Sequence, residues 1–303
     1  MNRRAAALFL AVSAVWGLPY LLIKVAVDDV GPVALAWVRI ALAVAVLLPL
    51  ARRTGAFAQL RRRLPVLVAI AVIEMIVPFV LIAVGEQYVT SSLAGILVAA
   101  MPLFVALLAL RVDRSERVGG ARLAGLGIGM VGVVLLLGVD VGGAPAELLG
   151  GLCIVAAAAC YALGALLIKR AASEGGVIGA MLPSLCIAAL LLAPAAAVTA
   201  PGELPSGGSL VALAALGVVC TAGGFWLYAS LIAEAGASRA AVITYVNPAV
   251  AVALGVFLLG EDVGAASVAG LLLIIAGSWL SAGGGPTAPR RERAPATEAV
   301  AVR

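Results

Sequence analysis

Two ionisable side chains stand inside long apolar runs of the sequence. Glu74 lies near the middle of the run from Val66 to Val84, and Arg39 lies within the run from Val33 to Leu50. Charged groups are costly in hydrocarbon and usually face a cavity or a partner of opposite charge. We therefore expect one of two arrangements. Arg39 and Glu74 bind the charge of a solute, with Glu74 able to exchange a proton, or they form a structural ion pair.

Aromatic side chains form a second set of candidates. Stacking surfaces combined with single hydrogen-bonding groups suit a cavity that accepts amphipathic solutes. The residues of this kind are Trp16, Tyr20, Tyr161, Phe225, Trp226, Tyr228 and Tyr245. The alternative for Trp and Tyr near helix ends is a place in the interfacial belt of a membrane, which we expect for Tyr88.

A polar residue beside a proline marks the apolar run near residue 247. Asn247 offers both a donor and an acceptor, and Pro248 frees the carbonyl group of Thr244 and can kink a helix. Pro102 predicts a similar kink in an earlier run. We expect Asn247 to line a cavity and the two prolines to act as hinges. The alternative for Asn247 is a hydrogen bond between helices.

The composition shows what must position these residues. Of the 303 residues 64% are hydrophobic and only 12% charged, and the mean hydropathy is +1.19. These values are typical of a membrane protein, in which every spanning segment must satisfy its own backbone hydrogen bonds. We therefore predict an all-α membrane protein with ten transmembrane helices. The ten apolar runs are Ala5–Val25, Val33–Leu50, Val66–Val84, Ser91–Leu110, Leu123–Val139, Leu148–Ile168, Val177–Val198, Leu210–Ile232, Ala237–Leu259 and Ser267–Leu280.

The charges between the runs support this segmentation. All of the 20 Lys and Arg residues except Lys24 and Arg39 fall on one side, and Glu86 and Glu261 are among the acids placed in connections of the other side. Basic residues collect on the cytoplasmic side, so we expect a bacterial inner-membrane protein with both termini in the cytoplasm. Because these bases form short clusters without a continuous basic face, we do not expect nucleic acid as a partner.

The first half of the chain recurs in the second. WGLPYLLIK at Trp16 to Lys24 matches YALGALLIK at Tyr161 to Lys169, 145 residues later, and Ser92 with Pro102 matches Ser238 with Pro248. We divide the chain into repeats at 1–142 and 143–282 and a disordered cytoplasmic tail at 283–303. Five helices per repeat make the second copy inverted, and two mirrored packings would open a central cavity to either face in turn.

The repeat also places Lys24 and Lys169 at opposite mouths, where they are candidates for gates. The alternative is snorkelling of both side chains to the interface. Small residues recur on one face of the fifth and tenth predicted helices and permit close helix contact. These glycines are Gly125, Gly129, Gly132, Gly270 and Gly277. They leave two possibilities open, a contact within the bundle or the seam of a homodimer.

The chain resembles the ten-helix EamA-type proteins of the drug/metabolite transporter superfamily. The resemblance rests on Trp16 and Gly17, on Pro32 followed by Arg39, on the S-x9-P spacing ahead of Glu261, and on the glycine-rich fifth and tenth runs. Arg111 to Glu116 departs from the expected L-G-E after the fourth run. The resemblance implies a secondary transporter of a metabolite or drug, often an exporter of amino acids, with a cavity near the midplane between the halves.

Other functions find less support in the residues. The chain has no histidine, no G-x-S-x-G or S-x-x-K, and every aspartate is predicted in a connection, so we do not expect an enzyme. It has no G-x-x-x-x-G-K-[ST] for ATP and no C-x-x-C for a metal, and we expect no cofactor. An importer and a non-transporting scaffold remain as alternatives. The expected partners are a small solute and the lipid bilayer.

Overall fold

The helices of the first half appear in the predicted order. The computed structural model describes residues 2–53, 56–57, 60–112, 120–140, 144–236 and 240–281. Spans one and two are single helices, and spans three to five each consist of consecutive segments. They are α1 Arg3–Val30, α2 Pro32–Arg53, α3 Leu60–Ile70 with η1 Ala71–Ile76 and α4 Val77–Glu86, α5 Ser91–Val98 with α6 Met101–Val112, and α7 Gly120–Leu135 with η2 Leu136–Asp140.

The second half follows the same plan. The long helix α8 contains spans six and seven and turns at Gly176, whose positive φ of 71° is open to glycine. Helix α8 is Pro145–Val198. It is followed by α9 Gly207–Ala214 with η3 Ala215–Gly223 and α10 Gly224–Ala235, then by α12 Ile243–Leu259 and α13 Ala265–Ser281. The η segments are π-helices.

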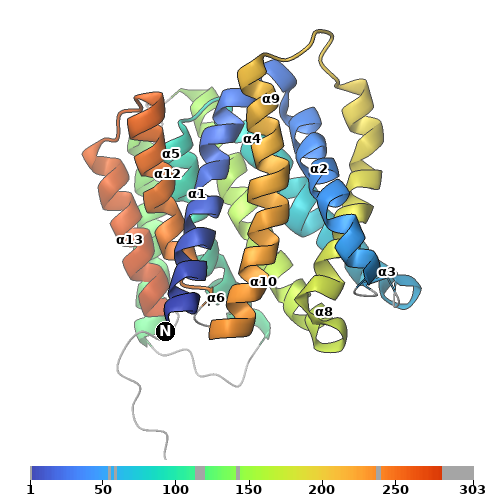
Figure 1. Cartoon of the computed structure of the whole chain (residues 1–303). Helices are drawn as coiled ribbons and strands as arrows, with labels where there is room; N and C mark the ends of the chain where they lie inside the picture. The colour runs from blue at the N-terminus through green and yellow to red at the C-terminus, as the bar shows by residue number, and fades with distance from the viewer. Residues whose placement is uncertain are drawn as a thin grey trace, which may run out of the picture.

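The structure confirms the all-α fold with ten spans. In the described part of the chain, eight helices are long and apolar enough to cross a membrane, and Ile243–Leu259 and Ala265–Ser281 are shorter apolar helices. Figure 1 shows the helices side by side, with the N-terminus at one end of the bundle and the connection from α8 to α9 at the opposite end. We call the end that holds Asn2 the near end and the other the far end.

Several helix boundaries differ from the prediction. The first span continues to Val30, five residues beyond the predicted Val25, so Asp28 and Asp29 lie in its last turns instead of in a connection. The expectation that every aspartate lies in a connection is therefore wrong. Asp29 accepts hydrogen bonds from the Ser209 hydroxyl at 2.6 Å and from the Ser206 N–H at 3.2 Å. These bonds join α1 to the start of α9. They stabilise the carboxylate of Asp29 at the end of a helix.

The two spans that contain the predicted proline hinges are broken at different places. In span four the helix is interrupted at Ala99 and Ala100, directly before Met101 and Pro102. In span nine the interruption at Ala241 and Val242 precedes α12, and Pro248 lies inside that helix. A proline removes the hydrogen bond to the carbonyl group four residues earlier, which accounts for the break before Pro102. The hinge roles of both prolines stay predictions.

The glycines of the fifth and tenth spans face one another within this chain. A Cβ at Gly277 would meet backbone atoms of Gly125 and Gly129, and a Cβ at Gly132 would meet the carbonyl oxygen of Gly270. Helices α7 and α13 therefore touch backbone to backbone, which only glycine permits. Of the two possibilities left open, the structure shows the contact within the bundle.

The described residues form three apolar cores, of which two are much the larger. One brings α1 and α5 together and includes Ile23, while the other joins α2, span three and α8 and includes Met75. Tyr161 packs against both cores. Tyr161 of the sixth span therefore links these two cores.

Candidate functional site

The third and eighth spans each contain a π-helix at the same place in the repeat. Residues 71–76, which form η1, correspond to residues 216–221 at the offset of 145, and these lie within η3, Ala215–Gly223. Short π-helical segments are rare and occur often at functional sites. Glu74 lies in η1 and Thr221 in η3, so each of the two corresponding π-helices contains a polar side chain inside the bundle. No residue pattern in the sequence indicated these segments.

Arg39 is held by residues of two other spans. Its side chain is 7% exposed, and its Nε donates a hydrogen bond of 2.8 Å to Thr221 Oγ1. The guanidinium carbon lies 3.9 Å from the centre of the Phe79 ring, a cation–π contact. Thr221 in turn donates to the carbonyl oxygen of Leu216 at 2.8 Å. These contacts fix the direction of the guanidinium group.

The alternative of an ion pair between Arg39 and Glu74 is wrong for this conformation. Within the described residues, the structure shows an ion pair between Arg4 and Glu234, at 3.7 Å, but none between Arg39 and Glu74. In this conformation Arg39 binds Thr221 through Nε and stacks on Phe79 instead. Sequence spacing alone does not reveal which side chains from other spans meet Arg39.

Glu74 faces the second half of the protein without a hydrogen-bonding partner. Its Oε2 atom is buried and unpartnered, and a Cβ added to Gly164 of α8 would overlap that atom. The charge of Glu74 is close enough to act on Tyr161 and Tyr228. A glycine at position 164 therefore leaves the space in which the carboxyl group of Glu74 rests against the sixth span.

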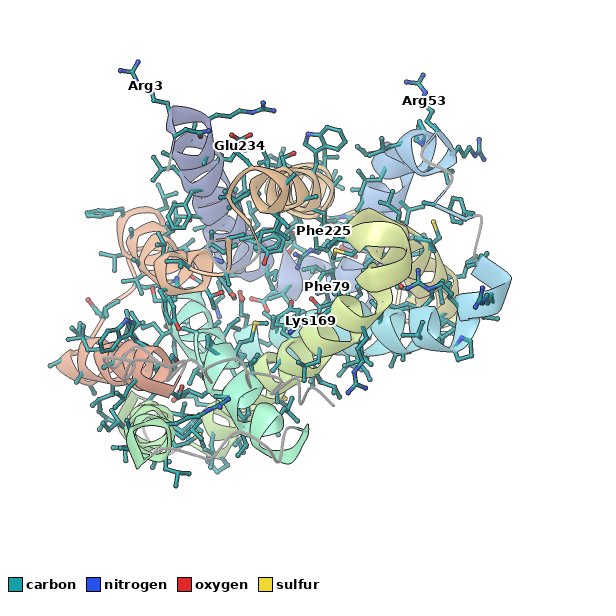
Figure 2. All side chains as sticks on the ribbon, turned by 90° about the horizontal axis from the view of Figure 1, so that it is seen from below. Arg3, Arg53, Phe79, Lys169, Phe225 and Glu234 are labelled. Carbon is teal, nitrogen blue, oxygen red and sulfur yellow. The ribbon has the colours of Figure 1, made fainter. Side chains whose placement is uncertain are left out.

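Three aromatic residues connect the first span to the eighth. Trp16 meets Phe225 edge to face, with ring centres 6.2 Å apart, and meets Tyr228 at 4.8 Å. The indole Nε1 donates a 3.2 Å hydrogen bond to the carbonyl oxygen of Cys220 in η3. In the end-on view of Figure 2, Phe79, Phe225 and Lys169 lie in the central part of the bundle.

Seven of the predicted site residues thus lie along the boundary between the halves. Tyr20 is buried, and the charge of Arg39 and the hydroxyl of Tyr161 both act on it. We call this set the central group. It consists of Trp16, Tyr20, Arg39, Glu74, Tyr161, Phe225 and Tyr228.

The other predicted site residues lie elsewhere. Trp226 is 52% exposed, as expected for a lipid-facing side chain. Tyr245 is half-buried, and the Oδ1 atom of Asn247 is buried without a hydrogen-bonding partner. Lys169 is exposed. Their roles in binding or gating stay predictions.

Lys24 does not reach freely into solvent. Its ammonium group donates hydrogen bonds to the backbone oxygens of Glu86, at 2.7 Å, and Val89, at 3.2 Å. Glu86 is the last residue of α4, where unsatisfied oxygens and the helix dipole favour a cation, and Val89 lies in the connection that follows. The gating role of Lys24 remains a prediction, but the structure gives this lysine a specific place at the far end.

The sequence reasoning missed Glu86. It was placed in a connection, yet it is 0% exposed and both of its carboxyl oxygens lack a hydrogen-bonding partner. The available signal was the helical spacing of Phe79, Ile82, Ala83 and Glu86, which puts all four on one buried face of α4. Because polar residues follow Glu86 directly, the sequence predicts that the apolar run ends before it.

Glu261 was also treated only as an acid in a connection. Its carboxylate accepts hydrogen bonds from the N–H groups of Ser91 and Ser92, at 2.8 and 2.9 Å, and from the Ser92 hydroxyl at 2.6 Å. Partial burial opposes ionisation, but these hydrogen bonds prevail and hold the pKa of Glu261 below its ordinary value. Glu261 therefore caps α5, a helix of the other half.

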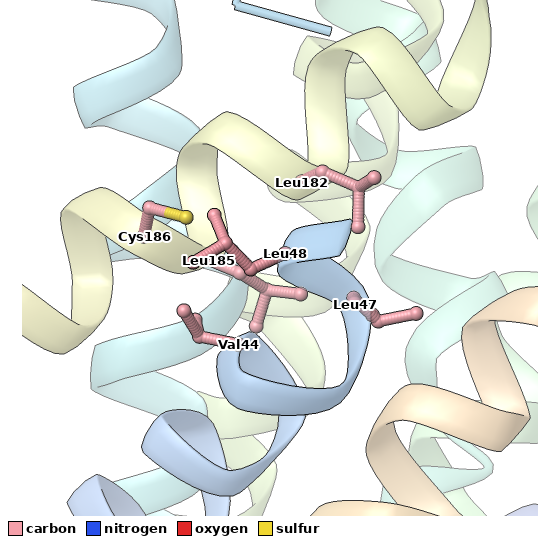
Figure 3. Close-up of a pocket in the computed structure, with 6 residues that line it drawn as sticks. All are labelled: Val44, Leu47, Leu48, Leu182, Leu185 and Cys186. Atoms are coloured by element: carbon pink, nitrogen blue, oxygen red, sulfur yellow. The ribbon is translucent and has the colours of Figure 1, made fainter. Parts of the chain in front are cut away.

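A crevice between α2 and α8 has the wrong chemistry for a solute site. Figure 3 shows its apolar lining, which consists of Val44, Leu47, Leu48, Leu182, Leu185 and Cys186. It leaves no space for a water molecule and offers no charged group. We interpret it as a packing feature between two spans, separate from the central group.

The fold and the central group are those of a multi-pass membrane protein whose two halves meet at a polar and aromatic boundary. The model of the EamA-like transporter family matches residues 3–138 and 148–283, which together make up most of the chain. The chain therefore belongs to the EamA-like transporter family, and the protein is a transporter. Membership in this family points away from an enzyme.

Comparisons with individual proteins agree with this assignment. An uncharacterized transporter of Archaeoglobus fulgidus is 28% identical over 88% of this chain and 94% of its own length. A probable amino-acid metabolite efflux pump of Salmonella typhimurium is 27% identical over 93% and 95%. YedA of Escherichia coli K12, an uncharacterized inner membrane transporter, is 29% identical over 83% and 81%.

A solved crystal structure shares the fold. It superposes with a TM-score of 0.63 over 93% of this chain and 97% of its own, at 22% sequence identity. At this identity the likeness concerns the architecture alone. It supports the arrangement of the helices that brings the central group together.

Proposed function

We propose that this protein is a secondary transporter that exports a small amino acid or a similar zwitterionic metabolite by alternating access. The observation that carries the proposal is the Oε2 atom of Glu74, which is buried against Gly164 without a hydrogen-bonding partner. A buried carboxyl oxygen in this state is stabilised by a proton or a cation. The solute supplies the cation if it carries an ammonium group, and a proton gradient across the membrane supplies the proton.

The central group offers complementary chemistry for each part of such a solute. The guanidinium group of Arg39 is a donor suited to a carboxylate, and Glu74 suits an ammonium group. The rings of Trp16, Phe225 and Tyr228 offer stacking surface for an apolar side chain. The names of the relatives in Salmonella typhimurium and Escherichia coli, probable amino-acid metabolite efflux pumps, support this class of solute.

Transport of the solute is coupled to protons if the solute and a proton compete for the carboxyl group of Glu74. A proton and the solute ammonium group cannot occupy Glu74 together, so binding of one releases the other. Exchange of a proton for a solute across the membrane is then antiport. The inverted halves supply the two access states, because each half can pack as the other does.

The proposed location is the inner membrane, with both termini in the cytoplasm. The near end of the bundle is then the cytoplasmic side and the far end the periplasmic side. The distribution of basic residues supports this orientation. One relative, YedA, is named as an inner membrane transporter.

The test begins with metabolites released by cells that express the protein, compared with cells that express Glu74→Gln. The released solutes are then measured by counterflow exchange in proteoliposomes that contain this protein alone. Exchange of an amino acid by the wild type supports the proposal. Metabolite release without exchange in the proteoliposomes would contradict it and favour a scaffold for another transporter.

A further inference from the structure

A second buried carboxyl group lies at the far end of the bundle, apart from the central group. Glu86 is the last residue of α4, is 0% exposed, and has no hydrogen-bonding partner on either carboxyl oxygen. An ionised carboxylate without partners is strongly disfavoured in such a place. The group must therefore hold a proton or gain a partner.

Charged neighbours of Glu86 come from three elements, but none of their charged side-chain groups bonds its carboxyl group. Lys24 of α1, Arg39 of α2 and Glu261 of the connection between α12 and α13 act on it electrostatically, and Glu86 itself acts on Tyr20. The ammonium group of Lys24 is bound to backbone oxygens. Arg39 is bound to Thr221 and stacked on Phe79. Both cations are thus committed elsewhere in this conformation.

The segment that follows Glu86 along the chain is bound by the opposite half. Glu261 binds the first turn of α5 through Ser91 and Ser92. We call these three residues the far-end latch. On another side, a Cβ at Gly85 would overlap Ile154 and the carbonyl oxygen of Gly150, so α4 and α8 are in direct contact. In this arrangement Glu86 is not exposed to solvent.

We propose that Glu86 is a second proton-binding site of the transporter, opened to water at the far end when the far-end latch releases. In the closed arrangement the carboxyl group holds its proton. When Glu261 leaves Ser91 and Ser92, the O–H bond of Glu86 breaks and the proton passes to water, leaving a carboxylate that Lys24 can neutralise. Return of the proton from water permits the latch to close again.

The proton itself is measured by infrared spectroscopy of the purified protein in liposomes during a pH titration. The wild type is expected to show a protonated carboxyl band at about neutral pH, where exposed carboxyl groups are ionised. Glu86→Gln is expected to remove one component of this band, and Glu74→Gln a different one. Glu203→Gln, an exposed residue in the connection before α9, is the control and should leave the band unchanged. An unchanged band in folded Glu86→Gln would overturn the proposal.

Access to the site is measured separately. Glu86→Cys, in a chain whose four natural cysteines are replaced, is labelled with a membrane-impermeant thiol reagent from the far end. Adding Glu261→Gln should accelerate labelling several-fold, whereas Asp262→Asn, which removes a charge from the same connection, should not. Equal rates for the two variants would overturn the latch. Neither measurement needs the solute, so failure here is distinguishable from failure of the proposed export function.

Discussion

The hydroxyl group of Thr221 accepts a hydrogen bond from Arg39 Nε at 2.8 Å and donates one to the carbonyl oxygen of Leu216. This arrangement joins the second span to the π-helical part of the eighth, and so joins one half of the protein to the other. The charge of Arg39 is directed by a neutral side chain. An acidic partner would have neutralised this charge.

Thr221→Val is expected to destabilise the protein. The substitution keeps the shape of the side chain but leaves Arg39 Nε buried without an acceptor, which costs about 1–3 kcal/mol. Thermal unfolding in detergent should show a lower midpoint than the wild type. Thr199→Val is the matched control, because the Thr199 hydroxyl is exposed and bonded only to the Ala195 carbonyl oxygen. Equal midpoints for the two variants would contradict the structural role of Thr221.

Arg39→Lys is expected to weaken solute binding while keeping the positive charge. Lysine lacks the planar group that stacks on Phe79 and the Nε donor directed at Thr221. We expect a loss of affinity of roughly tenfold, about 1.4 kcal/mol, for solutes that carry a carboxylate. Binding of the corresponding amides should change little. A similar loss for the acid and the amide would mean that Arg39 does not recognise the carboxylate.

Gly164→Ala is expected to disturb Glu74 directly. A methyl group at position 164 would occupy the place of the Glu74 carboxyl group, so exchange of solute should fall strongly. Gly127→Ala is the control, because that glycine is also helical and a Cβ there meets nothing within 4 Å. It should retain exchange and gain slightly in helix stability, by up to about 1 kcal/mol. Normal exchange of solute by Gly164→Ala would contradict the role of Glu74 in the site.

The stability of the protein should depend on Glu261 at acidic pH. The pKa of Glu261 is lower in the folded protein than its ordinary value of 4.5, so its hydrogen bonds contribute stability at higher pH. That contribution is lost as the pH falls through the folded pKa, below 4.5. Glu261→Gln should therefore show a weaker fall in unfolding midpoint over this range, whereas Asp262→Asn should follow the wild type. Parallel curves for the wild type and Glu261→Gln would contradict the prediction.

The ten spans, the duplication and several interior residues could be predicted from the sequence. Apolar runs, the sorting of basic residues and the match of Trp16–Lys24 to Tyr161–Lys169 each reflect a local or periodic property. The prediction that α7 and α13 permit close contact had the same origin, because glycine spacing on a helix face is visible in the chain. These patterns indicate that the chain lies in a membrane and which segments are helical.

The partners of the interior residues could not be predicted in this way. Arg39 meets Thr221 and Phe79 because three spans cross at one level, and no local pattern encodes that crossing. Glu86 was missed because polar residues follow it directly, although its helical face is buried. The exposed side of Trp226 likewise depends on how the eighth span is rotated against its neighbours.

The most direct test of the account is solute flux driven by a proton gradient in proteoliposomes of uniform orientation. The wild type and Glu203→Gln are expected to move the solute several-fold faster when a gradient is imposed than without one. Glu74→Gln is expected to bind the solute more weakly and to show no acceleration by the gradient. Equal acceleration of the wild type and Glu74→Gln would contradict the claim that this carboxyl group exchanges a proton for the solute.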